Sequence, residues 1–241
     1  MLMNNVFTTF TTPITTNKEF LTPEEAAEIM RVSTRTIYEM LRNNKLPATQ
    51  FGRQWRIRVS DILPSDIGVL IQEALEVDAQ GLTELALFKL EHIVRIHPYY
   101  ALGHWLLGTL AGRSRDYEKA IHHLQQAINL NSEYKLAYYN LGVAYNYLGD
   151  SQAFSVLEKA LELDPNYADT YYQLGYAYSY KRSYLEAIKM FEEAIKRDPN
   201  NTMAYHFLAR AYEHLKQPEK AQQIREELDN LATKNRMRFS F

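Results

Sequence analysis

The sequence predicts a mostly α-helical protein with one small region of β-strand, and three observations support this fold class. Glycine and proline are scarce, at 9 and 8 residues in 241, which favours helices over turn-rich β folds. Three residue landmarks recur with a period of 33 or 34 along the C-terminal two thirds of the chain. The hydrophobic pattern changes to a strand-like alternation only between residues 47 and 59.

Composition excludes several classes of function. The chain has no cysteine, so disulfides, thiolate metal sites and cysteine nucleophiles are excluded. No apolar stretch approaches the roughly 18 residues of a membrane span, and the threonine-rich first 20 residues lack the basic start and apolar core of a secretory signal. We therefore expect a cytoplasmic protein without a membrane partner. The seven histidines form no metal-binding helix motif and there is no phosphate-binding loop, so we expect no metal, no cofactor and no enzymatic activity.

The net charge of −2 conceals a strong asymmetry. Between residues 31 and 58 the chain carries seven cations against one acid, which gives this segment a charge of +6 and leaves −8 for the remainder. A compact basic region joined to an acidic body is typical of a surface that contacts a polyanion, although a solvated basic surface gives the same count. The cations are Arg31, Arg35, Arg42, Lys45, Arg53, Arg56 and Arg58.

The internal repeat is the strongest signal in the sequence. A Leu-Gly or Leu-Ala pair begins at residues 107, 141, 174 and 208, and an alanine recurs at residues 86, 120, 153, 187 and 221. Pro98, Ser132, Pro165 and Pro199 keep the same spacing. Each period predicts two amphipathic helices, for example over 168–181 and 184–197. Pro199 and the residue before it end the second helix, because proline cannot continue a helix.

These landmarks resemble the tetratricopeptide repeat family over about residues 67–232, in about five units of which the first, 67–100, is degenerate. The resemblance implies a right-handed α-solenoid in which neighbouring units bury a continuous core. It also implies a concave groove, built from the first helix of each unit, that binds a protein or peptide. Tyrosine supplies large contact area there at low entropic cost, although several tyrosines, such as Tyr138 and Tyr171, are expected to pack between helices instead. The expected groove residues are Trp105, Tyr139, Asn140, Tyr172, Gln173, Tyr176, Tyr180 and Phe207.

Residues 20–63 predict a different, smaller domain. Thr22 and Glu25 predict a capping box with Pro23 at the first helical position, and Ser33 predicts a second N-cap before a helix over 34–43. Ile37, Met40 and Leu41 form the apolar stripe of that second helix, and cations and hydroxyls lie opposite. Two short helices joined by a tight turn, with a polar second helix, are typical of a helix that enters the DNA major groove.

The stretch after these helices predicts a β-hairpin. Residues 47–51 and 55–59 alternate like strands, residues 52–54 form the turn, and Ser60 and Asp61 are expected to cap a further short helix through Leu63. Arginines at the hairpin tip and on its second strand suit contacts with phosphate or with a minor groove. We expect Trp55 to lie in the core beneath the hairpin rather than to stack on a base.

In order and spacing, residues 20–63 resemble the excisionase-type branch of the MerR-like winged helix-turn-helix domains, through 21–27, 32–38, 46–48 and 52–57. The resemblance implies double-stranded DNA as a partner, with a recognition helix and a two-stranded wing. Met30 and Arg31 depart from the usual Leu-Gly turn. Glu39 either accepts from a cytosine amine or pairs with Arg35 or Arg42, and we favour the pair. The expected DNA-binding residues are Ser33, Thr34, Arg35, Thr36, Tyr38, Arg42, Arg53 and Arg56.

We therefore expect a flexible arm over 1–19, a winged helix-turn-helix domain over 20–66, a repeat solenoid over 67–232 and a basic tail over 233–241, which we expect to be disordered. The function expected is a DNA-binding transcriptional regulator that recruits a protein through its repeats or forms a homo-oligomer. The alternatives are an interaction scaffold that does not bind DNA and an architectural, excisionase-like recombination factor.

Overall fold

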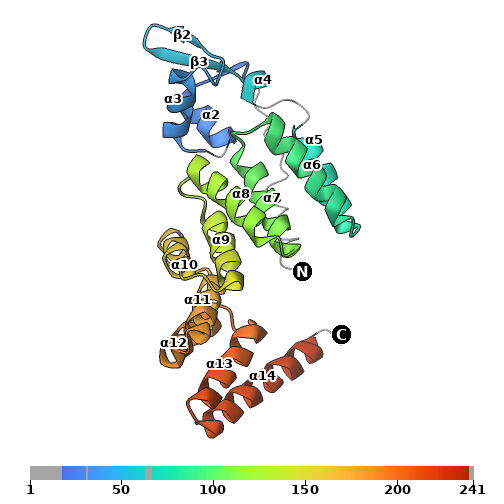
Figure 1. Ribbon diagram of the computed structural model, residues 1–241, viewed down its shortest axis with the longest axis vertical. Helices are drawn as coiled ribbons and strands as arrows, with labels where there is room; N and C mark the ends of the chain where they lie inside the picture. Colours follow the sequence, from blue (N-terminus) through green and yellow to red (C-terminus); the bar gives the residue numbers. More distant parts are fainter. Residues whose placement is uncertain (1–17, 31, 63–66, 239–241) are drawn as a thin grey trace. The chain divides into compact units, whose positions relative to one another are not determined.

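The computed structural model describes residues 18–30, 32–62 and 67–238, in two compact units, 1–137 and 138–241. The described residues are mostly helical, with three short strands near the start of the first unit (Figure 1). The predicted fold class, a small winged helix-turn-helix region followed by a helical repeat array, is confirmed. The expected arm over 1–19 lies outside the described residues except for Lys18 and Glu19, and Arg31 also lies outside them.

The first unit opens with β1 (Phe20–Leu21), α2 (Pro23–Met30), α3 (Thr34–Arg42), β2 (Thr49–Phe51), β3 (Gln54–Arg58) and α4 (Val59–Ile62). The three strands form an antiparallel sheet in the order β1-β3-β2. The prediction of a two-stranded wing is therefore incomplete, because β1 adds a third strand to the sheet. The short helix α4 begins at Val59, one residue before the predicted cap, and Leu63 lies outside the described residues.

The capping signals of α2 and α3 act as the sequence indicates. The amide of Thr22 donates to the Glu25 carboxylate at 2.9 Å, and the amide of Glu25 donates back to the Thr22 hydroxyl at 3.3 Å. Ser33 accepts from the amide of Thr36 at 3.1 Å and is the N-cap of α3. Each side chain satisfies an amide that the first turn of a helix leaves without a partner.

The remainder of the first unit contains α5 (Ile67–Ala79), α6 (Thr83–Ile96), α7 (Ala101–Arg113) and α8 (Tyr117–Leu130). The helix α9 (Lys135–Leu148) crosses the boundary between the two units. The second unit continues with α10 (Gln152–Leu163), α11 (Ala168–Tyr180), α12 (Tyr184–Arg197), α13 (Thr202–His214) and α14 (Pro218–Arg238). The predicted helices over 168–181 and 184–197 are confirmed to within one residue. The predicted disorder of the tail is wrong up to residue 238, because α14 continues through it.

Glycine allows the two helices of a repeat to approach closely. A Cβ atom added to Gly175 of α11 would lie 2.6 Å from the Phe191 ring of α12, and one added to Gly142 would lie 2.4 Å from Leu157. Atoms cannot approach so closely, so the bulky partner requires the glycine. The last repeat carries Ala209 at the glycine position, and Arg225 stands where the fourth repeat has Phe191.

The turn between the two helices of each repeat contains one residue with a left-handed backbone. Arg115, Arg182 and Lys216 have φ values of 66°, 60° and 57°, and glycines occupy the same place in two other repeats. A non-glycine residue there is strained by roughly 1–2 kcal/mol. The turn geometry is therefore a property of the repeat that the chain keeps even where the residue type disfavours it.

Candidate nucleic-acid interface and repeat groove

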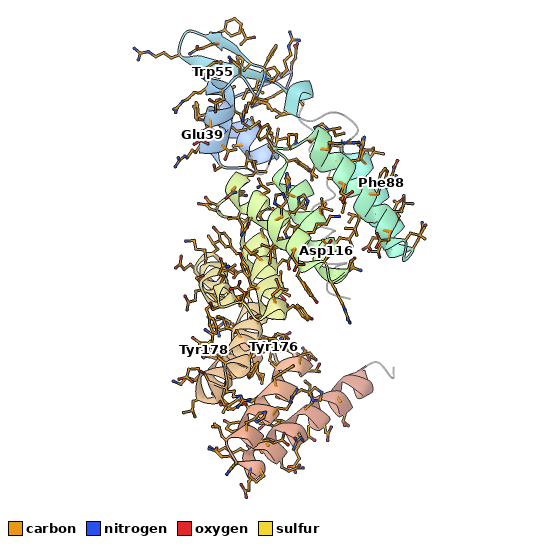
Figure 2. All side chains as sticks on the ribbon, in the orientation of Figure 1. Glu39, Trp55, Phe88, Asp116, Tyr176 and Tyr178 are labelled. Atoms are coloured by element: carbon orange, nitrogen blue, oxygen red, sulfur yellow. The ribbon has the colours of Figure 1, made fainter. Side chains whose placement is uncertain are left out.

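The recognition helix α3 buries the predicted stripe and exposes its charged side. Ile37, Met40 and Leu41 are buried, whereas the Arg35 side chain is 87% exposed. The Arg35 Nε donates to Glu39 Oε1 at 2.9 Å, four residues along the helix, and this hydrogen bond raises the pKa of the guanidinium. Glu39, labelled on α3 in Figure 2, therefore forms the favoured pair with Arg35. An exposed pair of this kind is weak, so a phosphate can compete for the guanidinium.

Two other predicted residues of α3 have different surroundings. The Tyr38 hydroxyl donates to Glu24 Oε1 of α2 at 3.2 Å, and burial followed by this hydrogen bond raises the pKa of Tyr38. The hydroxyl thus links α3 to α2, and it would have to leave Glu24 to reach a phosphate. Arg42 is exposed in the last turn of α3, where the helix dipole favours a cation.

The hairpin of β2 and β3 presents its arginines at the tip and along β3. Gly52 has a φ of +62° at the turn, and the exposed Arg53 follows it. The Arg56 guanidinium donates to Gln54 Oε1 at 2.8 Å. Trp55 is half-buried and pairs with Gln50 across the ladder. The sequence analysis predicts that the Trp55 ring lies in the core. Its half-buried position agrees with that prediction only in part.

The start of α3 is not free, because it contacts the end of α8 within the first unit. The Ser33 amide donates to the Leu130 carbonyl at 3.0 Å, and the Thr36 hydroxyl donates to the same oxygen at 3.1 Å. Leu130 is the last residue of α8, and a helix end leaves its final carbonyls without intrahelical partners. Thr34 lines a cavity of about 700 Å³ beside this contact, together with Asn131. Sequence reasoning missed this contact, which involves Ser33 and Thr36, two of the eight predicted DNA-binding residues.

The predicted groove residues of the second unit form a partly buried aromatic cluster. Tyr172 and Tyr176 pack edge-on against Phe207, with ring centroids 5.8 and 5.5 Å apart. Tyr139 packs edge-on against Tyr167 at 5.0 Å. Burial raises the pKa of Tyr139, and burial raises the pKa of Tyr172 to about 12. These two hydroxyls therefore stay protonated at neutral pH.

Polar residues of the same surface have defined positions. The Gln173 side chain accepts from the Asn146 amide at 3.1 Å, and Asn140 is half-buried. Tyr180 is 67% exposed. It borders a cavity of about 250 Å³ that Tyr176, labelled in Figure 2, shares with Phe207 and Arg210.

One predicted groove residue is buried instead. Trp105 of α7 is 3% exposed and packs against Tyr134, with ring centroids 5.8 Å apart. The expectation that Trp105 lines an open surface is therefore wrong, because its ring fills the space between α7 and the segment after α8. The other seven predicted groove residues are exposed or half-buried.

Comparisons with known proteins agree with both halves of this description. The family model for the helix-turn-helix domain matches residues 20–63. Models of tetratricopeptide repeats match residues 116–149, 151–181, 168–201 and 190–223. The chain is a helix-turn-helix domain fused to tetratricopeptide repeats. Both are families of binding domains rather than of catalysts.

The helix-turn-helix domain has relatives in Mycobacterium tuberculosis. Proteins of two strains, named as candidate DNA-binding proteins, are 39% identical to this chain over 44 residues. The match covers 18% of this chain and 56% of the length of each relative. The chain thus spans little more than half of the curated relatives that it matches.

The repeats are similar to solved structures at the level of fold. A crystal structure of MamA has a TM-score of 0.62 at 24% identity, over 68% of this chain and 96% of the other. The structure of YrrB, titled as a tetratricopeptide repeat protein with an unusual peptide-binding site, has a TM-score of 0.55 at 20% identity, over 67% and 84%. Among the described residues, no helix is both long and apolar enough to cross a membrane.

Proposed function

We propose that the chain is a DNA-binding transcriptional regulator whose helix-turn-helix domain, over about 20–66, docks on double-stranded DNA. The observation that supports this most directly is the exposure of Arg35 and Arg42 on α3 and of Arg53 at the tip of the wing. These cations belong to a segment of charge +6 in a chain that is otherwise acidic. Contacts of arginine with phosphate supply most of the affinity of such domains, and the affinity falls with salt.

The proposal predicts salt-dependent DNA binding that requires the exposed arginines. A selection from random DNA with the intact chain identifies the site, and fluorescence anisotropy then measures affinity across a salt series. The double variant Arg35→Ala/Arg53→Ala should bind more weakly and lower the slope of log affinity against log salt by about 2, since each phosphate contact contributes about 0.9. Lys189→Ala/Lys196→Ala, which removes two exposed cations from α12, is the matched control. An unchanged slope in the first variant would refute the DNA-binding assignment.

We further propose that the repeats, over about 67–232, recruit a protein or peptide or join copies of the chain. The aromatic surface around Tyr176, Tyr180 and Phe207 supports the first role, and Arg210 beside it adds a cation that suits an acidic or carboxylate-bearing segment. Tyr180→Ser with Arg210→Ser should abolish capture of the partner, whereas DNA affinity should not change. Equal capture by this variant and the native chain would exclude the surface.

A second function is favoured by the contact between α3 and Leu130. If the start of α3 stays on the end of α8, the helix-turn-helix domain is a fixed part of an interaction scaffold. That function predicts no salt-dependent DNA affinity but a tight protein partner. The same anisotropy series therefore distinguishes the two functions.

A further inference from the structure

The outer face of α6 carries an exposed apolar stripe that nothing in the described part of the chain covers. Leu82, just before the helix, and Leu85, Phe88 and Ile96 within it are 52%, 45%, 65% and 45% exposed. His92 lies between Phe88 and Ile96 and is also exposed. The spacing of three and four residues places these side chains on one side of the helix, and Phe88 is labelled there in Figure 2.

The repeat supplies an internal comparison, because the other units have polar residues at the positions of Leu85 and Phe88. Lys119, Gln152, Glu186 and Lys220 correspond to Leu85. His122, Ser155, Lys189 and Gln223 correspond to Phe88. The fold of a repeat thus requires no apolar residue at either position. The exposed pair Leu85 and Phe88 is therefore a property of the first repeat alone, and an exposed apolar patch of this kind marks an interaction site.

Two charged residues flank the stripe on one side. Glu84 and Arg95 are both exposed, and the helical repeat of 100° per residue places them within about 20° of one another around the axis. They are eleven residues apart, or about 16 Å along the helix, so they cannot pair within one copy of α6. The stripe from Leu82 to Ile96 and the pair of charges have nearly the same centre, at Lys89. The amine of Lys89 bonds to Glu73 of α5 at 2.8 Å.

We propose that this stripe binds a second copy of the chain, with the two α6 helices antiparallel about a two-fold axis. A two-fold contact places the same surface of both copies together. In the antiparallel arrangement, residues on one flank meet residues on the same flank of the other copy. Glu84 then faces Arg95 of the partner subunit, Arg95 faces Glu84 of the partner subunit, and the two Phe88 side chains lie near the axis. A parallel pair would place Glu84 on the flank opposite to Arg95 of the partner subunit.

The dimer rests on the proposed joining of copies through the repeats, and it does not require DNA binding. A contact made by one helix from each copy belongs to the small class of interfaces. We therefore expect a reversible dimer with a dissociation constant of about 1–100 µM. A dimer of helix-turn-helix chains would also present two copies of α3, as binding to a paired DNA site requires.

The first test is sedimentation of the full chain over a concentration series. The native chain should approach twice its mass of 28.2 kDa, and Leu85→Glu/Phe88→Lys should remain monomeric throughout. These replacements are the residues that the fourth repeat carries as Glu186 and Lys189, so the fold of a repeat accommodates them. Leu185→Glu, which changes an apolar residue that is 61% exposed on α12, is the control and should dimerise normally. A monomeric native chain, or a dimer that the double variant leaves intact, would overturn the proposal.

The second test establishes the arrangement of the helices. Glu84→Arg and Arg95→Glu should each weaken dimerisation by about tenfold, because each replaces two attractive contacts by two like-charge contacts. The combined variant Glu84→Arg/Arg95→Glu should recover the native dissociation constant. Because the two residues are too far apart to interact within one helix, recovery requires a second copy. Additive weakening in the combined variant would overturn the antiparallel arrangement.

Discussion

Locking the start of α3 onto the end of α8 should abolish specific DNA binding. The chain has no cysteine, so a cysteine pair introduced as Glu28→Cys/Glu133→Cys can be joined by a flexible bis-maleimide without other modification. Both positions line the cavity beside Ser33 and Thr34, and neither is a proposed DNA contact. Glu28 lies in α2, which directly precedes α3, and Glu133 follows the end of α8. The crosslink therefore holds the start of α3 beside the end of α8, while the DNA-binding side chains remain native.

The magnitude follows from the two hydrogen bonds to the Leu130 carbonyl, at 3.0 and 3.1 Å. A neutral intramolecular hydrogen bond contributes about 1 kcal/mol, so the two together favour the docked state by about 2 kcal/mol, or roughly thirtyfold. The native chain would then expose the start of α3 in about 3% of molecules. Its apparent DNA affinity would be about thirtyfold weaker than that of a chain in which the start of α3 is always exposed. The crosslink removes this remaining fraction.

Fluorescence anisotropy with the selected DNA site measures the effect. Affinity of the crosslinked chain should fall to the non-specific range, and cleavage of a reducible linker should restore it. Each single-cysteine variant carrying the same reagent controls for the modification itself. If the crosslinked chain bound its site with native affinity, DNA would be bound by the docked form through Arg35, Arg42 and the wing, and Ser33, Thr34 and Thr36 would not be DNA contacts. Absence of DNA binding in the native chain would instead refute the proposed function.

Three further predictions concern stability, each measured by urea unfolding. Gly175→Ala should destabilise the fold by about 1–3 kcal/mol, because its Cβ would overlap Phe191, whereas Gly68→Ala, with nothing within 4 Å, should not destabilise it. Arg182→Gly should stabilise the fold by up to about 1 kcal/mol by relieving the left-handed φ of 60°. Burial and then His104 lower the pKa of His123 to about 4. The unfolded chain therefore binds more protons between pH 6.5 and 4, stability should fall by about 1–2 kcal/mol as the pH falls through that window, and His123→Gln should flatten the dependence.

The sequence predicted the repeats well because their signal is redundant. The five alanines at residues 86, 120, 153, 187 and 221 are all 0% exposed. They occupy the same packing position in successive repeats, so the sequence indicates that position five times. Helix ends were also predictable where a side chain forms the cap, as Ser33 and Thr22 do. Each of these features is local or periodic.

Features that join distant parts of the chain were not predictable in this way. The strand β1 has two residues, too few to show an alternation. The contact of Ser33 and Thr36 with Leu130 joins residues more than 90 apart, and its acceptor is a backbone carbonyl that carries no information about residue type. Trp105 occupies a position that the repeat pattern assigns to the groove, but Tyr134 packs against its ring and buries it.

Comparison of the repeats with one another distinguishes positions that the fold requires from positions that differ in one repeat alone. A position that is alike in every unit, such as Ala187, is explained by packing between helices, since each unit must bury the same seam. A position at which one unit departs from the others has no such explanation. Phe88 is exposed where the other repeats have polar side chains, and the fold gains nothing from exposing it to water. The proposed contact with a second copy accounts for this departure, and the charges of Glu84 and Arg95 beside it suit a second copy of the same helix.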